Sequence, residues 1–244
     1  LIARTPEPLA AAAVAVAASA QSGAFVQTLA CDATDLAALQ PALEAFIAQR
    51  GAPDYLFNAV GYAYPQDLHA LTLADFERNM HANYYGQLAP TLALLPHFRA
   101  AGKGHIINIS SILGFIAAPG YATYTPSKYA LFGLSEALRS ELRQEGIRVS
   151  VAFPPDTDTP GFAEENRTKP PAVARMSSNT NKLLSPEAVA AAILRGVAAG
   201  RFEILVGDAR WMRPVSRIFP GLARRIIDQE YAKALKQVAQ MRNR

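Results

Sequence analysis

Short apolar runs alternate along the chain with longer segments in which apolar residues recur every three or four positions. The short runs, rich in β-branched and aromatic residues, predict strands at residues 1–3, 24–29, 55–58, 106–110, 148–153 and 202–206. The longer segments predict helices at residues 7–20, 35–50, 75–101, 125–145 and 185–199. Strands that alternate with helices of this length favour βαβ units. We therefore expect an α/β fold of three layers, αβα, built around a doubly wound parallel sheet.

Residues 154–184 break this alternation. They are rich in Pro, Thr, Asn and charged residues and show little periodicity, so we expect a long loop there. A loop of this length inside a compact domain is usually functional. Because open parallel sheets bind ligands beyond the carboxyl ends of their strands, polar residues that directly follow strands are the first candidates for a site.

The composition fits one domain spanning residues 1–244, half of whose residues are hydrophobic. The one cysteine, Cys31, cannot form an internal disulfide, which is typical of a reducing compartment, so we expect a cytoplasmic protein. The apolar run at residues 9–20 is shorter than the roughly 18 residues of a spanning helix and lacks the basic front of a signal peptide. Cys31 and the four histidines show no metal-ligand spacing, so no metal is predicted.

Positive charge is concentrated towards the C-terminal end. Residues 209–244 contain nine Lys/Arg and two Asp/Glu, a net charge of +7, against −3 for the rest of the chain. Apolar and basic side chains are interleaved there with a helical period: Trp211, Arg213, Val215, Arg217, Ile218, Phe219, Leu222, Arg224, Arg225, Ile226 and Ile227. This basic amphipathic segment predicts peripheral contact with an anionic membrane surface. The alternative is a helix packed on the core or on a second subunit. Nucleic acid is not an expected partner.

Tyr124 and Lys128 lie four residues apart in a predicted helix and so share one face. A free phenol has a pKa of about 10, too high for a base near neutrality. A neighbouring ammonium favours the phenolate and lowers that pKa, which suits a group that exchanges a proton with an alkoxide. The spacing alone is more typical of a surface Tyr and Lys on an amphipathic helix, so the catalytic interpretation depends on the residues upstream.

Three upstream features favour the catalytic interpretation. Ser111 follows the strand at 106–110, where a hydroxyl can bind a substrate carbonyl oxygen. The turn Asn58-Ala-Val-Gly61 follows another strand, and its small residues allow close approach of a ligand. Asn83 lies inside the predicted helix 75–101, where asparagine lowers helix propensity. Something other than helix stability should explain this asparagine.

These elements, in this order and spacing, resemble the short-chain dehydrogenase/reductase family over nearly the whole chain. The resemblance implies a Rossmann-type fold and direct hydride transfer between a nicotinamide cofactor and a carbonyl/alcohol pair. It implies that Tyr124 is the acid/base, that Lys128 lowers its pKa and holds the nicotinamide ribose, and that Ser111 positions the carbonyl. It further implies that Asn83 supports a proton-relay water and that Asn58 and Gly61 contact the cofactor.

The choice of cofactor depends on the residue after the first strand. Relatives that prefer NAD usually carry an acidic residue there, which binds the ribose hydroxyls. Arg4 suits a 2′-phosphate instead, so we expect NADP(H), although an ordinary surface arginine is the alternative. By the same resemblance, Asp32 should contact the adenine.

Two departures from the family pattern stand out. The Gly-rich first turn of the family is absent, so we expect an N-terminal strand and this turn to precede Leu1. After the strand at 148–153, the run Pro154-Pro-Asp-Thr-Asp-Thr159-Pro-Gly-Phe, followed by Glu164-Glu-Asn and Lys169-Pro, resembles the 3-ketodihydrosphingosine reductases of this family. That likeness implies NADPH-dependent reduction of a long-chain 3-keto amino alcohol. Pro154 and Thr159 would contact the cofactor, and the loop 154–184 would close over the substrate.

Two other functions stay open. The chain could reduce another carbonyl substrate, such as a 3-oxoacyl thioester, a steroid or a small ketone. It could also be a non-catalytic scaffold that has lost cofactor binding, which the absent Gly-rich turn favours. The resemblance also predicts a homo-oligomer, a dimer or a tetramer.

Overall fold

The computed structural model describes residues 1–20, 24–180 and 183–242. Small parts of the predicted loop 154–184 and of the basic segment 209–244 therefore lie outside the described residues. The strands form two parallel sheets, one of two strands and one of four in the order β3-β4-β5-β6. The strands are β1 (Ile2–Ala3), β2 (Leu29–Ala30), β3 (Tyr55–Asn58), β4 (Gly104–Ile109), β5 (Ile147–Phe153) and β6 (Glu203–Leu205).

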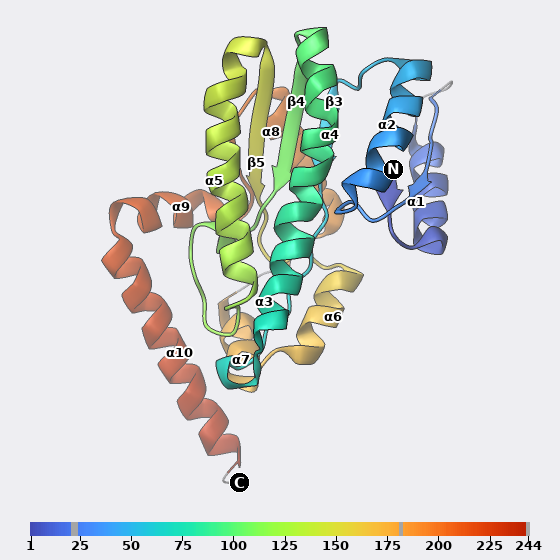
Figure 1. Ribbon diagram of the computed structural model, residues 1–244. Coiled ribbons are helices and arrows are strands. Elements are labelled where there is room, and N and C mark those ends of the chain that lie inside the picture. The colour runs from blue at the N-terminus through green and yellow to red at the C-terminus, as the bar shows by residue number, and fades with distance from the viewer. Residues whose placement is uncertain (21–23, 181–182, 243–244) are drawn as a thin grey trace.

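Helices of the described chain separate and follow these strands (Figure 1). They are α1 (Pro6–Ser19), α2 (Leu36–Arg50), α3 (Leu73–Met80), α4 (Gly86–Ala101), α5 (Tyr124–Leu142), α6 (Pro160–Thr168), α7 (Pro171–Thr180), α8 (Pro186–Ala198), α9 (Ala209–Ile218) and α10 (Pro220–Arg242). Helices α4 and α5 cover one face of the four-stranded sheet and α8 covers the other, as Figure 1 shows. The expected αβα layering is confirmed.

The core reflects the alternation of side chains along the strands. Ile106 packs in one cluster with Phe98 of α4 and Leu142 of α5. The next residue, Ile107, packs in a different cluster with Val189 and with other residues of α8. Successive residues of a strand point to opposite faces, so β4 is buried on both sides.

The N-terminal strands do not join the four-stranded sheet. Strands β1 and β2 pair with each other, whereas the expectation was one sheet containing every strand. The predicted strand 24–29 is also wrong over most of its length, because only Leu29 and Ala30 pair in β2. Residues 24–28 are largely exposed, so their apolar pattern has no surface to pack against.

The stretch at 154–184 is not the irregular loop that its composition predicts, because it contains α6 and α7. The Thr159 hydroxyl caps α6 by accepting a hydrogen bond from the Phe162 amide at 3.1 Å, and Pro160 occupies the first turn. Helix α7 also begins with proline, at Pro171. Both helices are short, α6 has no buried residue and α7 buries Ala172 and Val173, which explains why the sequence shows little hydrophobic periodicity there.

The predicted helix 75–101 is continuous but not uniform. Between α3 and α4 the residues His81–Tyr85 form a π-helical turn, which contains Asn83. Single π-turns inside α-helices occur frequently at functional sites. The low helix propensity of Asn83 thus coincides with a local departure from α-helical geometry.

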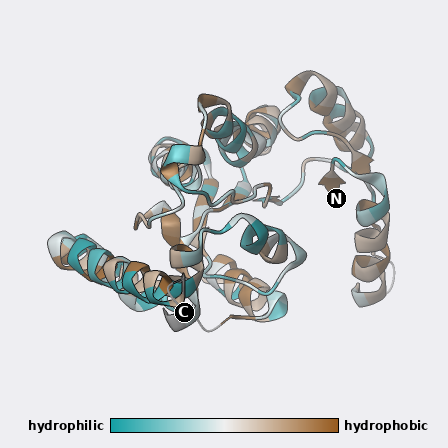
Figure 2. Cartoon of the chain, turned by 90° about the horizontal axis from the view of Figure 1, so that it is seen from below, coloured by the Kyte–Doolittle hydropathy of each residue, from teal (hydrophilic) through white to brown (hydrophobic). Residues whose placement is uncertain are grey.

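Helices α9 and α10 project from the body of the molecule, and α10 runs alongside α7 (Figure 1). Viewed from below, α10 carries hydrophilic and hydrophobic residues along its length (Figure 2). Within the described ranges, none of the helices combines the length and the hydrophobicity that crossing a membrane requires.

Candidate active site

The carboxyl end of β4 leads directly into the candidate site. Ser110 donates a hydrogen bond to the Lys128 carbonyl at 3.1 Å, which fixes the strand end against α5. Ser111 caps the short 3-10 helix Ile112–Gly114 by accepting from the Leu113 amide at 3.2 Å. A Cβ at Gly114 would lie 2.2 Å from the Ser110 Oγ, so only glycine allows this close approach.

Helix α5 positions the two residues of the Tyr-x-x-x-Lys pattern. Tyr124 is the first residue of α5, and the Lys128 Nζ lies 5.5 Å from the centre of the Tyr124 ring. The Lys128 side chain is buried, and its ammonium donates a hydrogen bond to the Ile109 carbonyl at 3.0 Å. The predicted sharing of one helical face is therefore confirmed, and the amine reaches across to the end of β4.

The expected lowering of the Tyr124 pKa is wrong for the protein without ligands. The pKa of Tyr124 is raised, chiefly because burial disfavours the phenolate, while hydrogen bonding with the Ser111 side chain acts in the opposite direction. Burial also lowers the pKa of Lys128 to about 7. Spacing predicted the proximity of phenol and amine, but desolvation of both groups dominates their charge states.

Asn83 links three parts of the site from the π-helical turn. Its Oδ1 accepts a hydrogen bond from the Tyr62 amide at 2.7 Å, and its Nδ2 donates to the Tyr62 carbonyl at 3.0 Å. The Nδ2 also lies 3.0 Å from the Ser127 hydroxyl, one residue before Lys128. A Cβ at Gly61 would lie 2.7 Å from Asn83 Oδ1 and 3.1 Å from Lys128 Nζ, so Gly61 lets the loop approach both. The proton-relay role of Asn83 stays a prediction.

The side chain of Asn58 lies in the core of the protein and bonds other buried side chains. Its side chain is buried, and Nδ2 donates to Thr91 Oγ1 and to Asn108 Oδ1, both at 2.9 Å. Asn108 in turn donates to the Ser135 hydroxyl at 2.9 Å. The amide of Asn58 therefore ties β3 to β4 and α4, and any contact with a cofactor at this position falls to the main chain.

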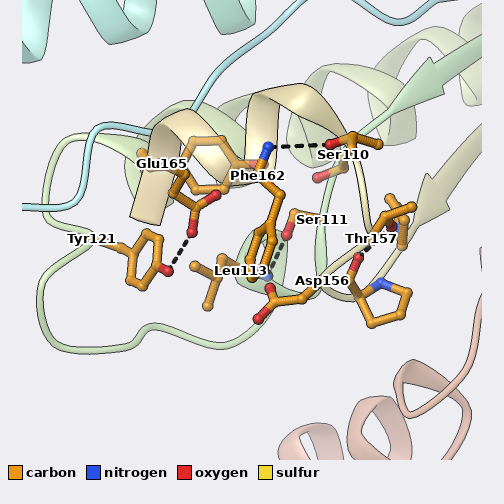
Figure 3. Close-up of a pocket in the computed structure, with 12 residues that line it drawn as sticks. Ser110, Ser111, Leu113, Tyr121, Asp156, Thr157, Phe162 and Glu165 are labelled. Carbon is orange, nitrogen blue, oxygen red and sulfur yellow. Dashed lines mark hydrogen bonds between the residues drawn. The ribbon is translucent and has the colours of Figure 1, made fainter. Parts of the chain in front are cut away.

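One cavity of about 140 Å³ brings four of the ten predicted residues together (Figure 3). Four of them line it: Ser111, Tyr124, Pro154 and Thr159. The remaining lining residues are Ser110, Leu113, Tyr121, Pro155, Asp156, Thr157, Phe162 and Glu165. A volume below the roughly 300 Å³ of a typical ligand pocket suits the reacting end of a ligand.

Sequence reasoning gave no role to a buried ionic group beside this cavity. The Tyr121 hydroxyl donates to Glu165 Oε1 at 2.5 Å, and Lys169 Nζ lies 3.2 Å from the same oxygen (Figure 3 draws the first contact). Lys169 also lies over the rings of Phe162 and Tyr121, at 4.6 and 5.9 Å. The four-residue spacing of Glu165 and Lys169 was the signal available, because such pairs meet on a helix.

Arg4 and Asp32 lie together just after β1 and β2, and neither is among the described residues that line the cavity. Their side chains are exposed and form a loose ion pair of 3.9 Å. Hydrogen bonds from the backbone and side chain of Thr34 hold the pKa of Asp32 below its usual value, and Arg4 adds to this effect. The structure thus brings the two predicted adenosine-side residues close to each other.

The chain belongs to the short-chain dehydrogenase family, because the family model described as short chain dehydrogenase matches residues 1–170. This match agrees with the parallel sheet and the position of the candidate site at the strand ends.

Two relatives have names that state their activity. The 3-ketodihydrosphingosine reductase of Dictyostelium discoideum is 38% identical over 183 residues, covering 73% of this chain and 54% of that protein. The 3-dehydrosphinganine reductase of Danio rerio is 36% identical over 208 residues, covering 80% of this chain and 62% of that protein. The chain therefore matches only a little more than half the length of these relatives.

Among solved structures, a short-chain dehydrogenase from Sphingobium yanoikuyae in complex with NADPH is 26% identical to this chain, with a TM-score of 0.72. The match covers 91% of this chain and 83% of that structure. The Rossmann-type architecture expected from the sequence is thereby confirmed.

Proposed function

We propose that this protein uses NADPH to reduce 3-ketodihydrosphingosine to sphinganine. The observation that carries the proposal is the shared cavity of Ser111 and Tyr124, with the Lys128 amine 5.5 Å from the phenol ring. The similarity to two reductases named for this substrate supports the choice of substrate.

The chemistry of the side chains favours reduction. Tyr124, like any phenol whose pKa is not lowered, is neutral near pH 7 and so carries the proton that a developing alkoxide needs. Ser111 lines the same cavity and can donate a hydrogen bond to that oxygen. In this proposal Tyr124 supplies the proton and Ser111 positions the carbonyl.

The residues present also fit a nicotinamide cofactor, which supplies the hydride when it is bound. An ammonium has three N–H donors, and the described contacts of Lys128 use one of them, on the Ile109 carbonyl. The others suit the hydroxyls of a ribose. Gly61 allows a ligand to approach beside Lys128, Pro154 and Thr159 line the cavity, and the main chain of Asn58 adjoins the same loop.

At the adenosine end, we assign Arg4 to the 2′-phosphate of NADP(H) and Asp32 to the adenine. The Arg4 side chain is 72% exposed, and its only described ion pair is the long contact with Asp32. It can therefore turn to a phosphate at little cost.

A substrate panel tests the proposal. Oxidation of NADPH is followed by absorbance with 3-ketodihydrosphingosine, a 3-oxoacyl thioester, a steroid ketone and a small ketone. We expect the highest kcat/KM with 3-ketodihydrosphingosine. Turnover of another ketone but not of this one rejects the substrate. Fluorescence titration without saturable NADPH binding would instead indicate a scaffold.

We further propose that α9 and the start of α10 contact a membrane surface, which would bring the cavity to a lipid substrate. Four residues of this segment that are about half exposed or more are apolar: Trp211, Ile218, Phe219 and Leu222. Arg217, Arg224 and Arg225 are exposed among them. Aromatic and basic residues together favour an anionic bilayer.

Two residues of this segment do not belong to the exposed surface. Arg213 forms a two-point ion pair with Glu203, at 2.8 and 3.0 Å, and Ile227 packs against the core. Sedimentation with phosphatidylserine vesicles should fall for Trp211→Ser. Unchanged sedimentation, with loss of a dimer or tetramer in the variant, assigns the surface to subunit contact.

A further inference from the structure

The cavity beside Tyr124 has a distinct electrostatic character. Two of its lining residues, Asp156 and Glu165, are acidic, and none of its described lining residues is Arg, Lys or His. Both carboxylates act on the Tyr124 phenol, whose pKa they help to raise. The rest of the lining is neutral. A cationic group is therefore favoured in this cavity and an anionic one is disfavoured.

Glu165 is the better positioned of the two carboxylates. It lies on α6, its side chain is 14% exposed, and two groups contact its carboxylate. Tyr121 donates to Oε1 at 2.5 Å, and Lys169 Nζ is 3.2 Å from the same atom. Among the described residues, both recorded contacts use Oε1, which leaves Oε2 for a group in the cavity. Two fixed contacts also reduce the entropy that Glu165 would lose on binding a ligand.

Lys169 does not cancel the charge that faces the cavity. Its side chain is 1% exposed and is absent from the described cavity lining. Its ammonium lies against the faces of Phe162 and Tyr121, at 4.6 and 5.9 Å from the ring centres. The pair is thus oriented, with the carboxylate towards the cavity and the ammonium turned into the protein.

The reaction centre is close to this carboxylate. The rings of Tyr121 and Tyr124 lie 6.2 Å apart, and Tyr121 holds Glu165 directly. Figure 3 shows Glu165 and Tyr121 facing each other at one side of the cavity. In a 2-amino-3-ketone the nitrogen is attached to the carbon next to the carbonyl. A substrate placed on Tyr124 therefore brings its amine within the span of this small cavity.

We infer that the Glu165 carboxylate binds the protonated amine of the substrate and so selects 2-amino ketones over other ketones. This inference rests on the proposed function and adds to it a residue that determines specificity. Lys169 and Tyr121 are positioning residues, because they act through Glu165.

The experiment compares two substrates in each of two variants. Wild type, Glu165→Gln and the matched control Glu164→Gln are assayed with 3-ketodihydrosphingosine and with its analogue that has hydrogen in place of the amine. Glu164 is 71% exposed and contacts Arg167, outside the cavity. We expect Glu165→Gln to lower kcat/KM for the amino ketone about 10- to 100-fold, mainly through KM. The analogue should change less than threefold, and Glu164→Gln should change neither.

A double variant distinguishes loss of amine binding from misfolding. Glu165→Gln leaves the buried Lys169 without its partner and can unfold the protein, so the double variant Glu165→Gln with Lys169→Met replaces the pair by neutral groups. Thermal unfolding checks both. We expect the double variant to lose the preference for the amino ketone while keeping turnover of the analogue.

The outcomes separate the two proposals. Equal losses with both substrates in the folded variants overturn the role of Glu165, while the proposed function stands. Failure of wild type to reduce 3-ketodihydrosphingosine, with turnover of other ketones, overturns the proposed function itself.

Discussion

The four-stranded part of the molecule and the N-terminal two-stranded part are built differently. In the first, polar residues of the candidate site are buried and cross-linked, as the contacts of Asn83 and Lys128 illustrate. In the second, Arg4 and Asp32 are exposed and form one loose ion pair. The residues proposed for proton transfer are thus held by several contacts, whereas Arg4 has one long described ion pair and Asp32 is held by Thr34. Variants in the first part should therefore have the larger effects.

The largest effect is expected from Tyr124→Phe. Removing the phenol hydroxyl removes the proposed proton donor, so kcat should fall by about 10²–10⁴-fold with little change in unfolding temperature. Tyr129→Phe on the same helix is the control, because Tyr129 is exposed and lies outside the described cavity lining. Steady-state NADPH oxidation measures both. Retention of most activity by Tyr124→Phe would remove the assigned proton donor.

The second-largest effect is expected from Asn83→Ala, which should lower the free energy of unfolding. It removes a fully buried side chain that bonds the amide and carbonyl of Tyr62, which costs about 2–4 kcal/mol of unfolding free energy. Asn166→Ala, at an exposed position of α6, should change stability by less than about 0.5 kcal/mol. Urea unfolding compares them. Equal stability of the two variants would mean that the π-helical turn is not held by these bonds.

Because of Lys128, the free energy of unfolding should rise with pH. Its folded pKa of about 7 lies below the 10.5 of an unfolded lysine, so between these values the unfolded chain binds more protons. The ligand-free protein should gain stability as pH rises from about 7 to 10, by at most about 1.4 kcal/mol per unit.

Lys128→Met should lack this contribution, and its loss of activity checks the catalytic assignment at the same time. Unfolding of wild type and variant at several pH values gives the difference directly. Parallel pH dependences would show that the Lys128 amine is not desolvated in solution.

Arg4→Ala should have the smallest effect, because its site is exposed. KM for NADPH should rise about tenfold while KM for NADH stays the same, since only NADPH carries the 2′-phosphate. Arg195→Ala, an exposed arginine of α8, is the control. Equal changes with both cofactors would contradict the assignment of Arg4 and the preference for NADP(H).

The sequence predicts well those features that depend on local order. The alternation of strands and helices, the strand-end position of Ser111 and the pairing of Tyr124 with Lys128 follow from spacing along the chain. Thr159 lines the cavity after β5, as the resemblance implies, but its role as the cap of α6 was not predicted.

Features that depend on how distant elements dock were not predictable. The inward orientation of Asn58 depends on the registry of β3 with β4, and the raised pKa of Tyr124 depends on burial by several segments. The Glu165–Lys169 pair is readable as a helical spacing, but its place beside Tyr121 depends on how α6 packs. Residues 24–28 show the converse, a strand-like pattern without a packing partner.

The most direct test of the central claim follows the transferred hydrogen itself. The protein is incubated with 3-ketodihydrosphingosine and NADPH carrying deuterium at the transferable position, and the sphinganine formed is analysed by mass spectrometry. The account predicts one deuterium at carbon 3 of sphinganine, with product formation lost in Tyr124→Phe. Absence of sphinganine, or sphinganine without the label, would contradict it.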